Sequence, residues 1–186
     1  LVYTNVLIKN WESFVKLGVR RVDMSGFLHH NVRLDYPISM GDYKFSSDPS
    51  KPVIIHLQSV PGEYGNPSAR QQFLSGQRRL LTTPFDEFER SIRAQLTRLL
   101  SPGGFDASED ILGITVNRWP HGYAYGYDPE SDQVAFDVDS WPAEKQHWKT
   151  ASKKFGNISI ASTDSASNAM SEAAIVEADR AVRDIK

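Results

Sequence analysis

Apolar and polar positions along the first third of the chain follow the pattern expected of β-strands. Three such segments, rich in Val, Ile or Leu, are residues 1–8, 31–36 and 53–60. A short helix is expected over residues 10–17. Gly18 is placed to end it, because glycine readily adopts the left-handed backbone found after helices. The Pro-, Gly- and Ser-rich stretches 46–52 and 61–68 predict loops.

The clearest helix that the pattern predicts covers residues 84–100. Thr83 is placed to cap it and Pro84 suits its first turn. Asp86 and Glu87 follow, where the helix dipole favours negative charge, and the run 102–104 (Pro-Gly-Gly) ends the helix. Apolar residues recur at spacings of 3, 4, 4 and 3 and form one stripe, which consists of Phe85, Phe88, Ile92, Leu96 and Leu99. We expect this helix to be scaffold.

The last third of the chain combines a long polar segment with a strand–turn–helix unit. A strand over residues 111–117 precedes the polar segment 126–156, and a loop of that length in a compact domain is usually functional or mobile. A strand at 157–161, a turn of small polar residues at 162–167 and a helix at 171–185 are expected next. The apolar face of that helix is shallow, so it can lie close to a sheet or a ligand; it consists of Ala174, Ala178, Ala181, Val182 and Ile185.

Composition narrows the classes of function. The net charge of −2 provides no large basic field to attract nucleic acid or anionic lipid. No run approaches the roughly 20 apolar residues of a membrane helix, so we expect a soluble α+β or α/β protein. The absence of Cys excludes disulfides, thiolate metal sites and cysteine nucleophiles. The chain opens inside a strand-like run without an initiator Met, and we therefore expect a piece of a longer polypeptide.

An aromatic corner follows the strand at 111–117. It presents Trp119, His121, Tyr123 and Tyr125 around a Trp-Pro-His-Gly turn. Aromatic side chains around a pocket can hold a planar cofactor or orient an amine through cation–π attraction. The same residues can also be core packing around a simple turn, and the residues alone leave both interpretations open.

The turn before the C-terminal helix is a second candidate site. A helix N-terminus presents unpaired backbone N–H groups and partial positive charge, which suits an anion or an electron-rich ring. Asp164 in this turn could accept hydrogen bonds from sugar or polyol hydroxyls. The alternative is an ordinary capped helix with Asp164 facing water.

Other candidates are weaker. His29 and His30 are adjacent, so they point opposite ways on an extended chain, and a solvated loop is expected there. His56 lies inside a strand pattern and is expected to be a hydrogen-bonded strand residue. The acidic stretch 128–139 lacks the spacing and the glycine of a calcium loop, so we expect no metal site.

Several of these stretches together resemble a known family. Residues 114–125 and 155–164, with Asp179-Arg180-Ala181-Val182, are similar to the C-terminal part of bacterial spermidine dehydrogenases, which are flavin-containing amine oxidoreductases. Further matches lie at residues 3–6, 10–11, 14–18, 34–37, 41–43 and 83–85, so the likeness spans nearly the whole chain. Its most specific part is the run Asn-Arg-Trp-Pro-His-Gly-Tyr-Ala at 117–124.

The resemblance implies the C-terminal part of a two-domain FAD-dependent amine oxidase-like fold. This part would comprise a mixed-sheet substrate domain and the last strand and helix of the Rossmann-like FAD domain. Residues 1–112 would form the second half of the substrate-binding domain. Residues 113–156 would supply the strand, aromatic corner and long loop that line the active site, and residues 157–186 the terminal strand–turn–helix of the FAD domain. The partner would be an N-terminal portion of the same protein, carrying the ADP-binding motif of the FAD site.

The resemblance also implies a site. Thr163 and Asp164 would contact the FAD, Asp164 through the ribityl chain. The backbone around Ala169, Met170 and Ser171 would face the flavin pyrimidine edge, where the helix dipole stabilises charge on the reduced ring. Four catalytic residues would lie near the isoalloxazine and line the amine channel: Trp119, His121, Tyr123 and Tyr125.

The implied activity is the dehydrogenation or oxidation of spermidine or a similar amine, with hydride passing from the amine α-carbon to flavin N5. The electron acceptor (oxygen, a quinone or a cytochrome), the bacterial compartment (periplasm or cytoplasm) and a homo-oligomer are left open. Haem agrees with the resemblance, but no ligand for it can be assigned. Asn157, Ser162 and Thr163 depart from the residues common in relatives. Two alternatives remain: a non-catalytic interaction or assembly module with the same fold, and a flavin oxidoreductase with a different substrate.

Overall fold

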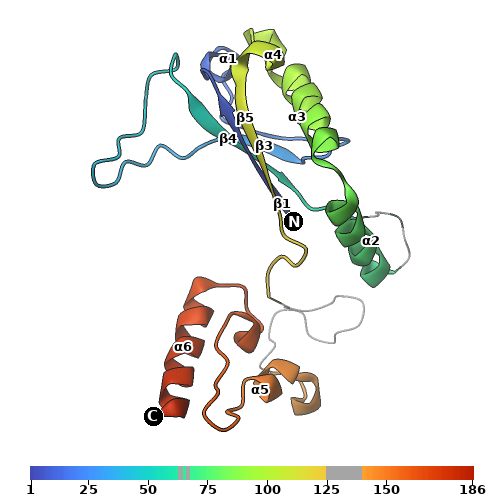
Figure 1. The fold of residues 1–186 in the computed structure, drawn as a ribbon, viewed down its shortest axis with the longest axis vertical. Helices are drawn as coiled ribbons and strands as arrows, with labels where there is room; N and C mark the ends of the chain where they lie inside the picture. The colour runs from blue at the N-terminus through green and yellow to red at the C-terminus, as the bar shows by residue number, and fades with distance from the viewer. Residues whose placement is uncertain (63–64, 66–67, 125–139) are drawn as a thin grey trace. The chain divides into compact units, whose positions relative to one another are not determined.

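The structure, a computed structural model, describes all residues except 63–64, 66–67 and 125–139 (Figure 1). It divides into two compact units, Leu1–His121 and Gly122–Lys186. The placement of the units relative to each other is not determined. The chain is therefore a mixed α and β protein with two separately packed bodies, and its division into the three expected domain segments stays a prediction.

A five-stranded antiparallel sheet forms the centre of the first unit (Figure 1). Alternate residues of β1 and β4 are buried, so one face packs into the core and the other stays partly exposed. β1 is central because it pairs with both β4 and β5. The order is β2-β3-β4-β1-β5, and the strands are β1 (Val2–Ile8), β2 (Arg21–Asp23), β3 (Asn31–Leu34), β4 (Val53–Ser59) and β5 (Ile111–Arg118).

The first unit also contains α1 (Glu12–Leu17), α2 (Ala69–Thr82), α3 (Phe85–Leu100), the 3-10 turn η1 (Ser101–Gly103) and α4 (Ala107–Asp110). Gly18 and Gly104 have left-handed backbone with φ of 66° and 92°, which confirms the expected helix ends. The expected Thr83 cap is wrong. Pro84 takes the capping position of α3, and the Thr83 hydroxyl instead donates to the Arg79 carbonyl oxygen at 2.7 Å, at the end of α2.

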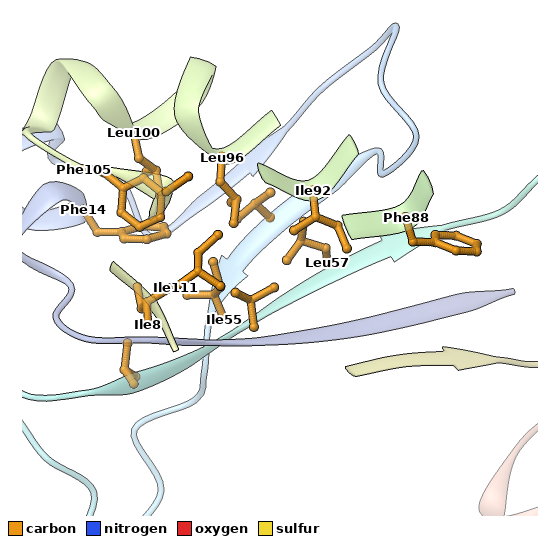
Figure 2. Packing of buried hydrophobic residues seen from close by; sticks show 14 of the residues in the cluster. Ile8, Phe14, Ile55, Leu57, Phe88, Ile92, Leu96, Leu100, Phe105 and Ile111 are labelled. Atoms are coloured by element: carbon orange, nitrogen blue, oxygen red, sulfur yellow. The ribbon is translucent and has the colours of Figure 1, made fainter. Parts of the chain in front are cut away.

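Helix α3 packs against the buried face of the sheet (Figure 2). Phe88, Ile92 and Leu96 are at most 2% exposed, and they pack with sheet residues such as Leu57. Burying one such side chain contributes about 2 kcal/mol to the stability of the fold. Phe85, which the spacing also placed in this stripe, is 45% exposed, so the stripe that reaches the core begins one turn later.

A polar cluster is buried in the same core. His29 is fully buried, and its Nε2 lies 2.9 Å from Thr4 Oγ1. Gln95 Nε2, from α3, donates to the His29 carbonyl oxygen at 2.7 Å. The expectation of a solvated loop is therefore wrong for His29, because α3 covers it, and right for the exposed His30. Burial lowers the pKa of His29 to about 4, since the charged imidazolium would lose its hydration.

The second unit contains short helices and one long helix. Trp141 packs edge-on against Trp148 of α5, with ring centroids 5.5 Å apart. α6 has the bounds expected from the sequence. The described elements are η3 (Ala143–Lys145), α5 (His147–Ala151), η4 (Asp164–Ala166) and α6 (Ser171–Ile185).

The strand expected at residues 157–161 does not form. An isolated bridge joins Phe155 and Ile158, and no strand is assigned to any described residue of this unit. A β-like sequence predicts extended backbone, but a ladder needs a neighbouring strand that supplies the hydrogen-bonding groups. No described segment of this chain supplies that neighbour.

Candidate functional site

The aromatic corner begins where β5 ends. The Trp119 N–H donates to the Leu1 carbonyl oxygen at 2.8 Å, and the Leu1 amino group donates to the Trp119 carbonyl oxygen at 2.9 Å. This backbone pairing holds Trp119 beside β1 and leaves its side chain 55% exposed. Gln77 Nε2, from α2, lies 3.4 Å from His121 Nε2 and donates to the Pro120 carbonyl oxygen at 3.1 Å. The first half of the corner is therefore tied to two elements of the first unit.

The second half of the corner belongs to the second unit. Tyr123 is 75% exposed and has a φ of 65°, a left-handed backbone that residues other than glycine rarely adopt. Such conformations are often found at functional sites, where surrounding contacts maintain them. Tyr125 lies outside the described residues. Trp119 and His121 are therefore near each other in one unit, and their approach to Tyr123 and to the turn at 162–167 stays a prediction.

The turn before α6 has a defined backbone. The Thr163 carbonyl oxygen accepts from the N–H groups of Ala166 and Asn168, each at 3.2 Å. The Asp164 N–H donates to Ser162 Oγ at 3.1 Å, while the exposed Asp164 carboxylate makes no hydrogen bond or ion pair with a described residue. This acidic side chain is thus free to accept hydrogen bonds from a ligand.

The start of α6 lacks a side-chain cap. Met170 occupies the capping position, is 56% exposed and accepts no capping hydrogen bond in its side chain. Ala169 and Ser171 on either side are exposed. The first N–H groups of a 15-residue helix are therefore open to a ligand or to water.

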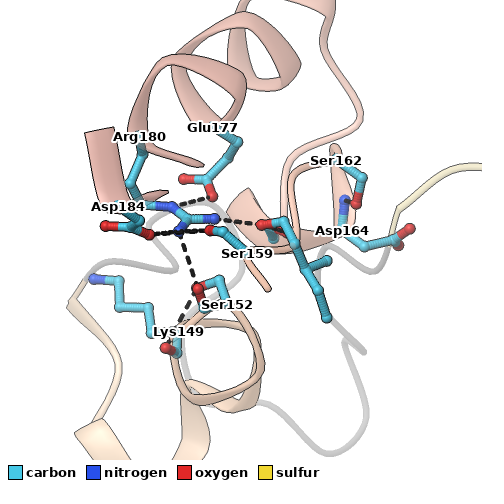
Figure 3. Close-up of polar contacts among 10 residues, drawn as sticks. Lys149, Ser152, Ser159, Ser162, Asp164, Glu177, Arg180 and Asp184 are labelled. Carbon is cyan, nitrogen blue, oxygen red and sulfur yellow. Dashed lines mark hydrogen bonds and ion pairs between the residues drawn. The ribbon is translucent and has the colours of Figure 1, made fainter. Parts of the chain in front are cut away.

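Arg180 of α6 joins the segment before the turn to the end of α5 (Figure 3). Its guanidinium donates to Glu177 Oε2 at 2.8 Å and to Asp184 Oδ2 at 2.6 Å. It also donates to the carbonyl oxygens of Ser152, at 3.0 Å, and Ile160. Hydrogen bonding to Glu177 is the main reason that the pKa of Arg180 is raised, with the Asp184 charge adding to it. Arg180 thus positions the segment before the turn.

The positioning role of Arg180 was not predicted from the sequence. The acidic residues three positions before it and four positions after it are the signal that could have indicated part of it. The two carbonyl partners come from distant segments and have no local signal. A groove of about 650 Å³ lies beside this network, and its charged lining residues are Lys149, Lys153, Lys154, Glu177, Arg180 and Asp184.

The remaining histidine candidate is structural. His56 Nδ1 lies 2.8 Å from Asn5 Oδ1, and His56 Nε2 lies 3.0 Å from Asp35 Oδ1. With both ring nitrogens engaged, His56 is a hydrogen-bonded strand residue, as expected. Among the described residues, no group of three or more His, Asp or Glu could hold a metal ion. The acidic stretch 128–139 lies outside those residues.

No protein-family model matches the chain, and no curated protein sequence matches it. Over the described part of the chain, no helix has both the length and the apolar character needed to cross a bilayer.

Proposed function

We propose that this chain is the C-terminal part of an FAD-dependent amine oxidoreductase that acts on spermidine or a similar amine. The main observation behind this proposal is the turn at 162–168. It combines an Asp164 carboxylate that has no partner among the described residues with the start of α6, which has no side-chain cap. A carboxylate can accept hydrogen bonds from a ribityl chain, and a helix N-terminus suits an electron-rich flavin edge. The resemblance of residues 114–125 and 155–164 to spermidine dehydrogenases supports the same conclusion.

The residues of the turn offer groups that could bind a flavin. Thr163 and Asp164 offer oxygen acceptors to ribityl hydroxyls, and the side chains around them are small. Ala169, Met170 and Ser171 would bring backbone N–H groups to the pyrimidine edge. FAD, when bound, supplies the hydride acceptor for oxidation of the amine α-carbon.

Uncovered apolar side chains in the second unit support a missing sheet. Ile175 of α6 is 69% exposed and Val182 is 48% exposed, although they recur at helical spacing. Phe155 lies just before residues 157–161, where a strand was expected, and Ile158 lies within them; the two are 82% and 63% exposed. An N-terminal FAD-binding portion of the same protein would cover this surface and would supply the neighbouring strand.

In the proposed site, Trp119, His121 and Tyr123 would orient the amine. The exposed indole and phenol rings can hold a cationic or neutral amine through cation–π and apolar contacts. Orientation of the α-carbon toward the cofactor would be their main contribution to rate.

The experiment expresses the full-length gene and records its visible spectrum before and after anaerobic addition of spermidine. We expect a flavin band that bleaches with the amine. Absence of the flavin, or a flavin that no polyamine reduces, refutes the proposal.

A variant pair tests the role of the turn. Asp164→Ala should weaken FAD retention by roughly 10-fold or more, because a hydrogen bond to a charged group contributes about 1.5–3 kcal/mol. Asp179→Ala is the matched control, since Asp179 is an exposed acid of α6 paired with Arg183 at 2.6 Å. Equal FAD retention in the two variants would exclude Asp164 from the flavin site.

A further inference from the structure

Helix α2 is unusual in its charge. Its 14 residues include Arg70, Arg78 and Arg79 and no acidic residue. None of the three guanidinium groups makes an ion pair or side-chain hydrogen bond with a described residue. Among the described residues the helix therefore presents three positive charges without an ionic partner, over about 21 Å of length at 1.5 Å per residue.

The outward face of α2 is also apolar. Phe73, Leu74 and Leu81 are 66%, 53% and 56% exposed. At 100° per residue they share a face with Arg70, and Arg78 flanks it. Gln77 lies on the same face and donates to the Pro120 carbonyl oxygen, but the three apolar side chains around it stay more than half exposed and form a stripe.

The side of α2 next to Phe73 packs on the first unit, because Leu80 and Gly76 lie about 20° and 60° from Phe73 around the helix. Leu80 is 2% exposed, and Gly76 lies so close to the loop before α2 that an added Cβ would come within 2.1 Å of the Pro61 carbonyl oxygen. Inward packing through these two positions holds the helix on the first unit. The stripe of Phe73, Leu74 and Leu81 is consequently displayed by a fixed helix.

We propose that α2 docks on an anionic lipid surface, with Phe73, Leu74 and Leu81 inserted at the headgroup boundary. The positive charge of the helix complements acidic lipid headgroups, and long arginine stems allow guanidinium groups to reach phosphates while the apolar side chains insert. A second copy of the chain would bring arginine against arginine, which disfavours it as the occupant. A convex stripe also suits a fluid surface, which needs no shape-matched groove.

Vesicle flotation of the 186-residue chain tests this docking. We expect binding to phosphatidylglycerol vesicles at low salt and little binding to phosphatidylcholine vesicles. Arg70→Glu/Arg78→Glu should weaken binding at least about 25-fold, from roughly 5-fold for each arginine removed. Phe73→Ser/Leu74→Ser should also abolish flotation.

One control variant makes the same change in net charge as the arginine variant, and a second removes two exposed apolar side chains as the Phe73/Leu74 variant does. Arg90→Glu/Arg183→Glu makes the same charge change on α3 and α6, and Ile38→Ser/Met40→Ser removes apolar groups that are 61% and 80% exposed. Both controls should float as the unchanged chain does. Failure of the unchanged chain to float, or equal loss in the control and α2 variants, overturns the proposal.

Insertion has its own readout, because the chain contains no Cys and accepts a single engineered label. An environment-sensitive fluorophore on Leu81→Cys should shift to the blue on anionic vesicles, and one on Ile38→Cys should not. Flotation without a shift at Leu81 contradicts insertion of the stripe. Binding of α2 to an acidic protein instead of vesicles would also contradict the proposal. The docking is independent of the flavin proposal, since it needs no cofactor.

Discussion

Acid should destabilise the first unit through one histidine. His29 is fully buried, and its pKa is lowered from 6.5 to about 4 by burial. An unfolded chain therefore takes up a proton at His29 between these values, whereas the folded chain does not. Proton uptake at His29 by the unfolded chain alone lowers the free energy of unfolding. The fold is therefore unaffected by His29 above pH 6.5 and loses stability as the pH falls toward 4.

The magnitude follows from the shift. A difference of about 2.5 pKa units at 1.36 kcal/mol per unit corresponds to about 3 kcal/mol of unfolding free energy. This is a large share of the free energy of unfolding of an ordinary domain, which is roughly 5–15 kcal/mol. Other groups with shifted pKa values, such as Asp48 and Asp106, are unchanged by a substitution at His29.

Urea unfolding, followed by circular dichroism of the sheet, provides the assay at pH 7.5 and at pH 4. His29→Gln removes the titrating group, and the exposed neighbour supplies the control His30→Gln. The unchanged chain and the control should lose about 3 kcal/mol more between the two pH values than His29→Gln does. An equal loss in all three proteins would refute the burial argument.

Three further substitutions test the packing. Gly76→Ala should destabilise the first unit by about 2 kcal/mol, because its Cβ would meet the Pro61 carbonyl oxygen at 2.1 Å; a urea midpoint at or above that of the unchanged chain contradicts this. Ile92→Ala should cost about 2–5 kcal/mol in urea unfolding, since Ile92 is fully buried. Arg180→Ala, which loses five hydrogen-bond partners at a side chain 29% exposed, should speed proteolysis of the second unit relative to Arg183→Ala.

Local patterns predicted most of the regular elements. The bounds of α6 and the strands β1, β4 and β5 followed from apolar spacing, and Gly18 marked the end of α1. α2 was missed because its arginines and glutamines dilute the apolar period, and three of its apolar residues (Phe73, Leu74 and Leu81) face outward. Helices, which satisfy their own backbone hydrogen bonds, and strands with strictly alternating apolar and polar residues can be predicted from the sequence alone.

Nonlocal contacts account for what the sequence did not reveal. The burial of His29 depends on Gln95, 66 positions away, and the strand at 157–161 required a partner that the described chain does not contain. In the candidate site, Asp164 and the start of α6 were predictable from the turn and helix pattern. The carbonyl contacts of Arg180 were not, because Ser152 and Ile160 reach it from segments with no shared periodicity.

The central proposal is that Tyr123 and the turn before α6, both in the second unit, contact one flavin. A density map of the full-length protein tests it most directly. The account predicts an isoalloxazine beside Tyr123, with its ribityl chain at Asp164 and a sheet from the N-terminal portion covering α6. A map in which Tyr123 and Asp164 lie on unrelated surfaces, with no cofactor between them, would contradict the account.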